Sequence, residues 1–278
     1  MGKVIMIQGT SSGAGKSVLS TALCRIFKQD GYKVAPFKAQ NMSSNYHTLA
    51  NGDKMARSQA IAAYACGIAP HVDMNPVLLM PSDRTSADVI LNGKSNGALD
   101  SPTYTEFKQN AFSHVLEAFH RLSSTHDIIV AEGAGSPVEM NLIQNDIVNM
   151  SFAEAVQAPV ILISDITRGG TFASLYGTMM LLTEAQKALV KGLVVNKFKG
   201  DISYFGDGKS IIEQLCTTPV VGVIPHTAIK IEDEDSITDF GHEAKTRQLF
   251  ENNMEQAFDE LAAHFRTYLE MEKIYEII

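Results

Sequence analysis

Cysteine is scarce in this chain of 278 residues, and long apolar runs are absent from it. The three cysteines, Cys24, Cys66 and Cys216, are scattered and form no C-x-x-C pair. That spacing argues against a disulfide framework or a zinc site, and for reduced thiols in or near a core. No run approaches the roughly 18 apolar residues of a membrane span, and "VIMIQG" is too short for a signal peptide. We therefore expect a cytoplasmic protein without a membrane partner.

A basic excess is also missing, since the formal net charge is −8. Proteins that bind nucleic acid generally carry an excess of lysine and arginine, so no nucleic-acid partner is expected. Local lysines and arginines can still bind an anionic substrate. The eight histidines show no spacing typical of a metal site.

Short runs of β-branched residues alternate with helical stretches along most of the chain. This alternation predicts an α/β fold of the P-loop NTPase-like kind, a mainly parallel β-sheet with helices on both faces. The expected strands are 3–7, 33–37, 87–91, 127–131, 159–164, 192–196 and 220–224, and the expected helices are 15–29, 54–66, 103–123, 145–157, 171–188 and 207–216.

The last fifty residues differ from the rest. Residues 230–243 are acidic and poor in apolar side chains, and we interpret them as a connector. Apolar residues then recur at helical spacing from Phe250 to Leu269, which predicts a long amphipathic helix. We expect an ATP-binding domain over 1–229, with the helix of 230–278 packed on that domain. The alternative is a helix that docks on a partner.

The stretch "QGTSSGAGKSVLS" between the first strand and first helix indicates a phosphate-binding loop. The pattern G-x-x-x-x-G-K-[ST] requires a glycine at Thr10, whereas the glycine is Gly9, one residue early. Strand, glycine loop and amphipathic helix are nevertheless the setting such a loop needs. Lys16 is expected to bridge the β- and γ-phosphates of ATP, and Ser17 to hold Mg²⁺. The residues expected to contact the nucleotide are Gly13, Ala14, Gly15, Lys16, Ser17 and Val18.

Polar residues stand at the ends of several other predicted strands, where open α/β sheets bind ligands. Glu132 ends a buried strand before Gly133-Ala134-Gly135, which suits Mg²⁺ held directly or through water. Asn196 is expected to meet the nucleotide base. Lys38 also stands at a strand end, with the hydrogen-bonding groups of Asn41 and Ser43 nearby, although a polar surface loop is an equal alternative on composition alone. Arg168 could bind a phosphate or a carboxylate.

Taken together, these segments closely resemble the N-terminal synthetase domain of the cobyric acid synthases. The resemblance covers about residues 4–226 and rests on "QGTSSGAGKSVLSTALCRIF", "VAPFKAQNMSSN", "EGAGSPVEMNL", "ISDITRGGTFASLYGT" and "VKGLVVNKFKGD". It implies a dethiobiotin synthetase-like fold and an ATP- and Mg²⁺-dependent carbon–nitrogen ligase. Such an enzyme amidates carboxylates of a corrinoid through an acyl phosphate in cobalamin biosynthesis. By this resemblance, Lys16, Lys38 and Glu132 are the catalytic candidates. The resemblance also makes Lys38, Asn41, Ser43, Arg57 and Arg168 the candidates for the substrate side.

Three features depart from that family. Members continue into a glutaminase domain, which we do not expect within these 278 residues. Met80 stands where a lysine is expected, and Thr167 where an aspartate is expected. The protein is therefore expected to receive ammonia from a separate glutaminase subunit, to use free ammonia, or to be a paralogue with another, dethiobiotin synthetase-like acceptor. A nucleotide-switched partition-type ATPase is a further alternative, although the loop lacks the lysine of those proteins. The sequence leaves open whether the protein is a homodimer.

Overall fold

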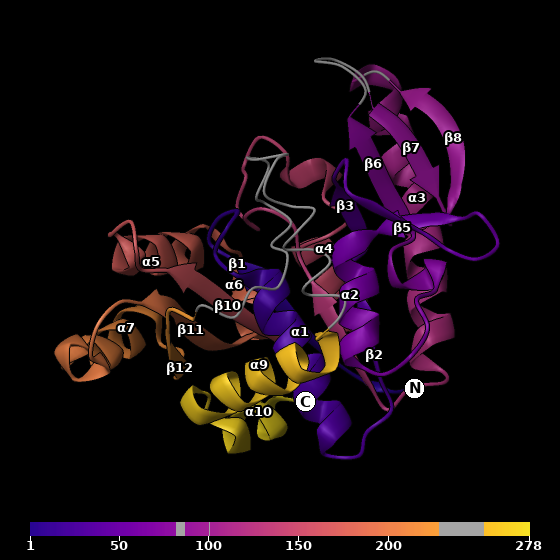
Figure 1. Ribbon diagram of the computed structural model, residues 1–278. Helices are drawn as coiled ribbons and strands as arrows, with labels where there is room; N and C mark the ends of the chain where they lie inside the picture. Colours follow the sequence, from indigo (N-terminus) through magenta and orange to yellow (C-terminus); the bar gives the residue numbers. More distant parts are fainter. Residues whose placement is uncertain (82–86, 100, 228–252) are drawn as a thin grey trace.

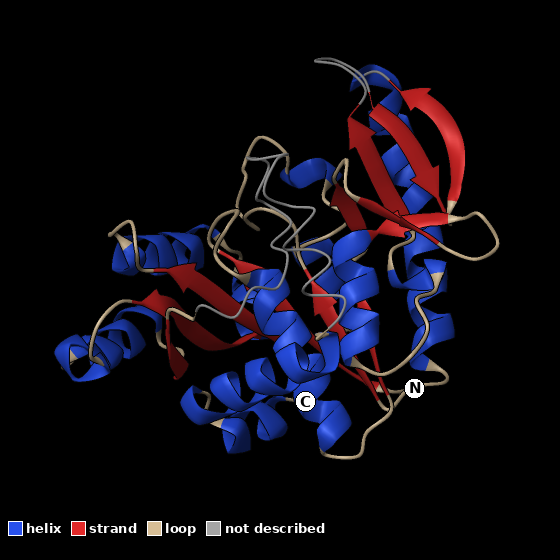
Figure 2. Ribbon diagram, in the orientation of Figure 1, coloured by secondary structure: helices blue, strands red, loops and turns tan. Residues whose placement is uncertain are grey.

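A parallel six-stranded sheet forms the centre of the molecule in the computed structural model, which describes residues 1–81, 87–99, 101–227 and 253–278 (Figures 1 and 2). Neighbouring strands follow the order β12-β11-β10-β1-β9-β2, and every pairing between them is parallel. The predicted fold class is therefore confirmed. The strands are β1 (Lys3–Gly9), β2 (Val34–Phe37), β9 (Ile128–Glu132), β10 (Val160–Asp165), β11 (Val190–Phe198) and β12 (Val220–Pro225).

Helices cover both faces of this sheet because its strands are apolar on both sides. Ile5 and Ile7 of β1 face one core, whereas Met6 between them faces the other. The core around Ile5 is closed by α1 (Lys16–Gln29), α2 (Arg57–Ala65), α9 (Met254–Tyr268) and α10 (Met271–Ile277). The core around Met6 is closed by α3 (Ser101–Ser123), α4 (Met150–Val156), α5 (Thr171–Leu181), α6 (Glu184–Leu189) and α7 (Gly208–Cys216).

A second, mixed sheet was not predicted. It consists of β3 (Gln40–Met42), β6 (Val77–Pro81), β7 (Ala87–Leu91) and β8 (Lys94–Leu99), in the order β3-β6-β7-β8. A short hairpin, β4 (Tyr46–Thr48) and β5 (Lys54–Ala56), precedes α2. The predicted strand 87–91 therefore exists, but it belongs to this sheet and not to the central one.

The switch between the two sheets is fixed by a buried asparagine. Only Lys38 and Ala39 separate β2 from β3, so the chain leaves the central sheet at Lys38. The Asn75 side chain donates hydrogen bonds to the carbonyl oxygens of Lys38 and Val77, at 3.0 and 3.1 Å, and accepts one from the Ala56 backbone at 2.9 Å. This network fixes where Lys38 lies relative to the central sheet.

Several predicted helices are shorter than expected. The segment 171–188 is two helices, because the chain is extended at Leu182 and Thr183 then caps α6 in a capping box with Gln186. The segment 54–66 begins as strand β5, and the segment 145–157 is α-helical only from Met150.

The C-terminal segment contains two helices where one was predicted. After α9 the chain is extended at Leu269, which bridges to Gly222 of β12, and the Glu270 N–H donates to the Val221 carbonyl at 2.8 Å. Helix α10 begins only after this contact with the edge strand. Helix α9 packs on α1, where Arg25 pairs with Glu255 and Asp259. The connector 230–243, the boundary at 229/230 and Phe250 lie outside the described residues.

All three cysteines are free and buried, as predicted. Across the described part of the chain, no helix is both long enough and apolar enough to cross a membrane.

Candidate active site

The phosphate loop joins the end of β1 at Gly9 to the start of α1 at Lys16. Gly15, the residue before the helix, has a φ of 99° and lies in the left-handed region. A side chain there would also collide with the Asn196 amide, so only glycine fits. The backbone N–H groups at the start of α1 are the donors that an anion at a helix N-terminus uses.

The early position of Gly9 has a structural explanation. The Lys16 side chain runs back over Gly9, and a Cβ added at Gly9 would lie 3.1 Å from Lys16 Cγ and Cδ. Lys16 is buried, and its Nζ donates to the carbonyl oxygens of Ser11 and Gly135, both at 3.1 Å. The glycine thus stands where the lysine stem must pass, and Thr10 instead bonds to Ser164 of β10 at 3.1 Å.

Glu132 is the centre of a buried polar cluster at the carboxyl end of β9. Its Oε1 accepts from Ser17 Oγ at 2.7 Å and from Lys38 Nζ at 2.9 Å. Its Oε2 accepts from Gln59 Nε2 at 3.2 Å. The structure thus brings together the phosphate-loop serine, the lysine at the sheet switch and the carboxylate that ends β9. Every member of this cluster is at most 9% exposed.

A second polar group lies beneath the loop, at the carboxyl ends of β10 and β11. Asn196, which is 4% exposed, donates from Nδ2 to the Ala14 carbonyl at 2.9 Å. Lys197 Nζ donates to the Gly13 carbonyl and pairs with Asp165 at 3.2 Å. Asn196 thus supports the loop backbone here, and its contact with a nucleotide base stays a prediction.

The Asp165 carboxylate is held ionised in this group. Partial burial of Asp165 raises its pKa. The Thr167 hydroxyl and N–H donate hydrogen bonds to the carboxylate, at 2.6 and 2.7 Å, and Lys197 adds a positive charge. These interactions outweigh the burial, so the pKa of Asp165 is lowered. Lys197 adopts a φ of 61°, in the left-handed region where the Cβ of most residues other than glycine is crowded. Thr167, the departure from the family pattern, therefore has a local partner in Asp165.

The candidates for the substrate side are not all brought into one cluster. Asn41 is buried on β3, and its Nδ2 has no acceptor within the residues that the structure describes. Arg57 is buried as the first residue of α2. Ser43 is half-buried and accepts from the Asn45 N–H at 3.0 Å, and Arg168 is exposed in the loop before α5. Val18 is half-buried on α1.

The cluster's chemistry fits a magnesium ion. Over the described ranges no three His, Cys, Asp or Glu side chains lie close enough to hold a metal by themselves. Mg²⁺ in nucleotide sites is usually held by only one or two protein groups, by phosphate oxygens and by water. The hydroxyl of Ser17 and the carboxylate of Glu132, 2.7 Å apart, offer oxygen atoms of the kind that Mg²⁺ prefers, and their role in holding the ion stays a prediction.

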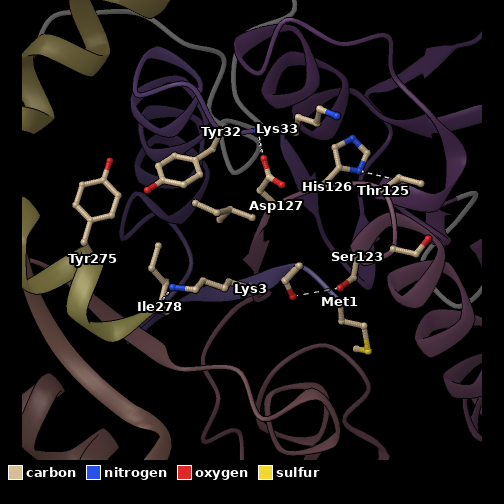
Figure 3. Close-up of a pocket in the computed structure, with 13 residues that line it drawn as sticks. Met1, Lys3, Tyr32, Lys33, Ser123, Thr125, His126, Asp127, Tyr275 and Ile278 are labelled. Carbon is tan, nitrogen blue, oxygen red and sulfur yellow. Dashed lines mark hydrogen bonds between the residues drawn. The ribbon is translucent and has the colours of Figure 1, made fainter.

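A separate cavity of about 770 Å³ lies at the opposite end of the sheet (Figure 3). It is lined at the amino ends of β1, β2 and β9 by Lys3, Lys33, His126 and Asp127, with Tyr275 and Ile278 from α10 and the chain end. Ligands of open α/β sheets bind at the carboxyl ends of the strands. None of the predicted site residues lines this cavity.

Comparison of the sequence with known proteins also indicates a nucleotide-binding domain. Residues 5–236 match the model of the CobQ/CobB/MinD/ParA nucleotide binding domain. The chain belongs to this family. It is 52% identical over 237 residues to a cobyric acid synthase from Photorhabdus laumondii, covering 85% of this chain and 46% of that protein. A cobyric acid synthase from Listeria welshimeri is 50% identical over 84% of this chain and 46% of its own length.

The resemblance to the cobyric acid synthases is therefore confirmed, and the chain spans about half the length of these relatives. The signal recognition particle receptor FtsY from Elizabethkingia anophelis matches 94% of this chain and 66% of its own at 18% identity, with a TM-score of 0.45. The signal recognition particle 54 kDa protein from Aeropyrum pernix covers 94% of this chain and 49% of its own at 15% identity, with a TM-score of 0.44. These likenesses are too weak to carry an argument.

Sequence reasoning missed two residues of this nucleotide-binding domain. Gln59 contacts Glu132 from α2, and its one signal is a glutamine within the alanine-rich helix "RSQAIAAYA". Lys197 contacts the phosphate loop, and its signal is its place directly after Asn196 at the end of a strand. Both contacts join segments far apart in the chain, so no local pattern identifies the partner.

Proposed function

We propose that the protein is an ATP- and Mg²⁺-dependent ligase that converts carboxylates of a corrinoid to amides through an acyl phosphate. The observation that carries this proposal is the cluster in which Glu132 joins Ser17 of the phosphate loop to Lys38 at the sheet switch. Identity of about 50% to cobyric acid synthases supports the corrinoid as the substrate.

The proposed reaction needs charge neutralisation and positioning more than covalent chemistry. A substrate carboxylate oxygen attacks the γ-phosphorus of ATP, and ADP leaves. Ammonia then attacks the carbonyl carbon, phosphate leaves, and the nitrogen loses a proton to give the amide. The first step makes the carboxylate a good electrophile, because phosphate is a far better leaving group than oxide.

The chain's own residues have separate parts in this scheme. Lys16 exchanges the Ser11 and Gly135 carbonyl oxygens for phosphate oxygens and offsets their charge. Ser17 and Glu132 would hold Mg²⁺, which supplies further neutralisation of the phosphate charge. Lys38, which contacts Glu132, would lie near the transferred phosphoryl group, and Asn41, Ser43, Arg57 and Arg168 remain the proposed contacts to the corrinoid.

Two other functions remain as alternatives. The matched family model includes partition-type ATPases as well as synthetases, so it does not by itself separate them. The relatives at about 50% identity favour the synthetase. Met80 and Thr167 are the residues that favour a paralogue with a different carboxylate acceptor.

The test is ADP release from Mg-ATP and ammonium, with and without cobyrinic acid a,c-diamide, followed by mass analysis of the corrinoid. We expect the corrinoid to stimulate ADP release and to show the mass change of each carboxylate converted to an amide. Activity with ammonium but not with glutamine would direct the search to a separate glutaminase subunit. ATP binding without any corrinoid effect would refute the corrinoid substrate and favour the paralogue.

A further inference from the structure

Gln59 is the one partner of Glu132 to which neither the phosphate-loop pattern nor the family resemblance assigns a role. It lies on α2, is 1% exposed, follows Arg57 and Ser58, and is itself followed by the apolar residues of the same helix. Its Nε2 donates to Glu132 Oε2 at 3.2 Å, whereas Ser17 and Lys38 both contact Oε1. Gln59 therefore fixes the second oxygen of the carboxylate and so its orientation.

The carbonyl oxygen of the Gln59 side chain, Oε1, is buried and lacks a hydrogen-bond partner among the described residues. A buried carbonyl oxygen without a donor costs about 1–3 kcal/mol, so such groups are rare and call for an explanation. Holding Glu132 needs only the Nε2 group. The orphaned oxygen therefore points to a donor that arrives with a ligand.

We propose that Gln59 is a positioning residue for the magnesium–nucleotide complex. It holds Glu132 through Nε2 and accepts, at Oε1, a hydrogen bond from the water that Mg²⁺ keeps when it binds with ATP. Mg²⁺ dehydrates reluctantly and retains several waters in nucleotide sites, and these waters are strong donors. This inference rests on the ATP and Mg²⁺ site of the proposed function, and it does not depend on the corrinoid acceptor.

The test measures how much Mg²⁺ is needed for ATP binding, with a fluorescent ATP analogue titrated at fixed Mg²⁺ concentrations and in EDTA. Gln59→Met keeps the size of the side chain but removes both polar atoms. We expect it to raise the Mg²⁺ concentration for half-maximal binding about tenfold, the equivalent of one hydrogen bond to a charged group. Binding of the analogue in EDTA should stay within about twofold of the unmodified protein, because the loop itself is unchanged.

The matched control is Gln186→Met. Gln186 is also a buried glutamine that donates to a glutamate, with Nε2 at 3.3 Å from Glu154 Oε2, but it caps α6 away from the phosphate loop. We expect it to lower the melting temperature and to leave the Mg²⁺ requirement unchanged. Should Gln59→Met not fold, Gln59→Ala replaces it, since alanine suits an alanine-rich helix.

The outcomes separate the two proposals. A Gln59 variant with an unchanged Mg²⁺ requirement and only a lower melting temperature would show that Gln59 is merely structural. An unmodified protein that binds the analogue equally well with Mg²⁺ and in EDTA would overturn this inference, and it would leave the proposed ligase to the ADP-release test. A raised Mg²⁺ requirement in a protein that does not amidate the corrinoid would uphold Gln59 and refute the acceptor.

Discussion

Lys38 and Glu132 form a buried ion pair, with Nζ and Oε1 2.9 Å apart and side chains that are 5% and 2% exposed. The two residues are 94 positions apart in the chain: Lys38 directly follows β2, and Glu132 ends the neighbouring strand β9. A buried charge is tolerable only beside its partner. The pair therefore couples the stability of the fold to the integrity of the candidate active site.

This coupling gives the first prediction. Lys38→Met and Glu132→Gln should each lower the free energy of unfolding by about 3 kcal/mol, because each leaves one buried charge without its partner. The double variant should cost about 2 kcal/mol less than the sum of the two. Urea unfolding of all four proteins measures the difference. The exposed pair Lys187 and Glu184 provides the control cycle, with an expected coupling below about 0.5 kcal/mol. Strict additivity for the buried pair would contradict the prediction.

Lys16→Ala should abolish ATP turnover while the protein stays folded. The Lys16 ammonium donates to the backbone carbonyl oxygens of Ser11 and Gly135, which are uncharged acceptors. ADP release should fall by at least about 100-fold, with little change in the circular dichroism spectrum. Lys191→Ala, at an exposed lysine of β11, should leave turnover unchanged. Turnover that survives in Lys16→Ala would refute the site assignment.

The packing of the C-terminal helices should depend on pH through Asp30. Partial burial disfavours the Asp30 charge, but hydrogen bonds from Arg266 and Tyr275 and the charge of Arg266 outweigh it and lower the pKa of this carboxyl. A lowered folded-state pKa contributes stability that is complete above the unfolded value, about 4, and is lost as pH falls through the folded value.

Asp30→Asn should therefore be less stable than the unmodified protein at pH 7, by at most about 1 kcal/mol for so exposed a pair. The difference should shrink as the pH falls below about 4. Thermal unfolding of both proteins between neutral and acid pH measures it. A difference that does not change with pH would show that Asp30 acts by packing and not by its charge.

Two glycine-to-alanine variants should differ in their effects: one should weaken ATP binding, and the other should stabilise the fold. Gly9→Ala places a methyl group 3.1 Å from the Lys16 side chain, and we expect it to weaken ATP binding about tenfold by displacing that lysine. Gly177→Ala fills open space within α5, so it should stabilise the protein by about 0.5–1 kcal/mol. Equilibrium ATP binding and urea unfolding test the pair. An unchanged ATP affinity in Gly9→Ala would mean that Lys16 adapts to the methyl group.

Local patterns in the sequence were sufficient to predict much of the fold. The strand, glycine loop and helix around Lys16, and the apolar strands buried on both faces, follow from periodicity and from glycine chemistry. Sequence reasoning did not find the second sheet. Its strands β3 and β8 are short or polar, "QNM" and "KSNGAL", and they form only because neighbouring strands pair with them.

The sequence by itself determined that this chain carries a phosphate loop on an α/β sheet, because those signals lie within a few residues of one another. Only the tertiary structure decided which side chains share the loop. It brought Gln59 and Lys38 to Glu132, and Lys197 to Gly13, from segments widely separated along the chain. It also divided the C-terminal helix at Leu269, where the edge strand β12 offers a backbone partner. Contacts of this kind depend on how the strands are ordered in space, which no local pattern records.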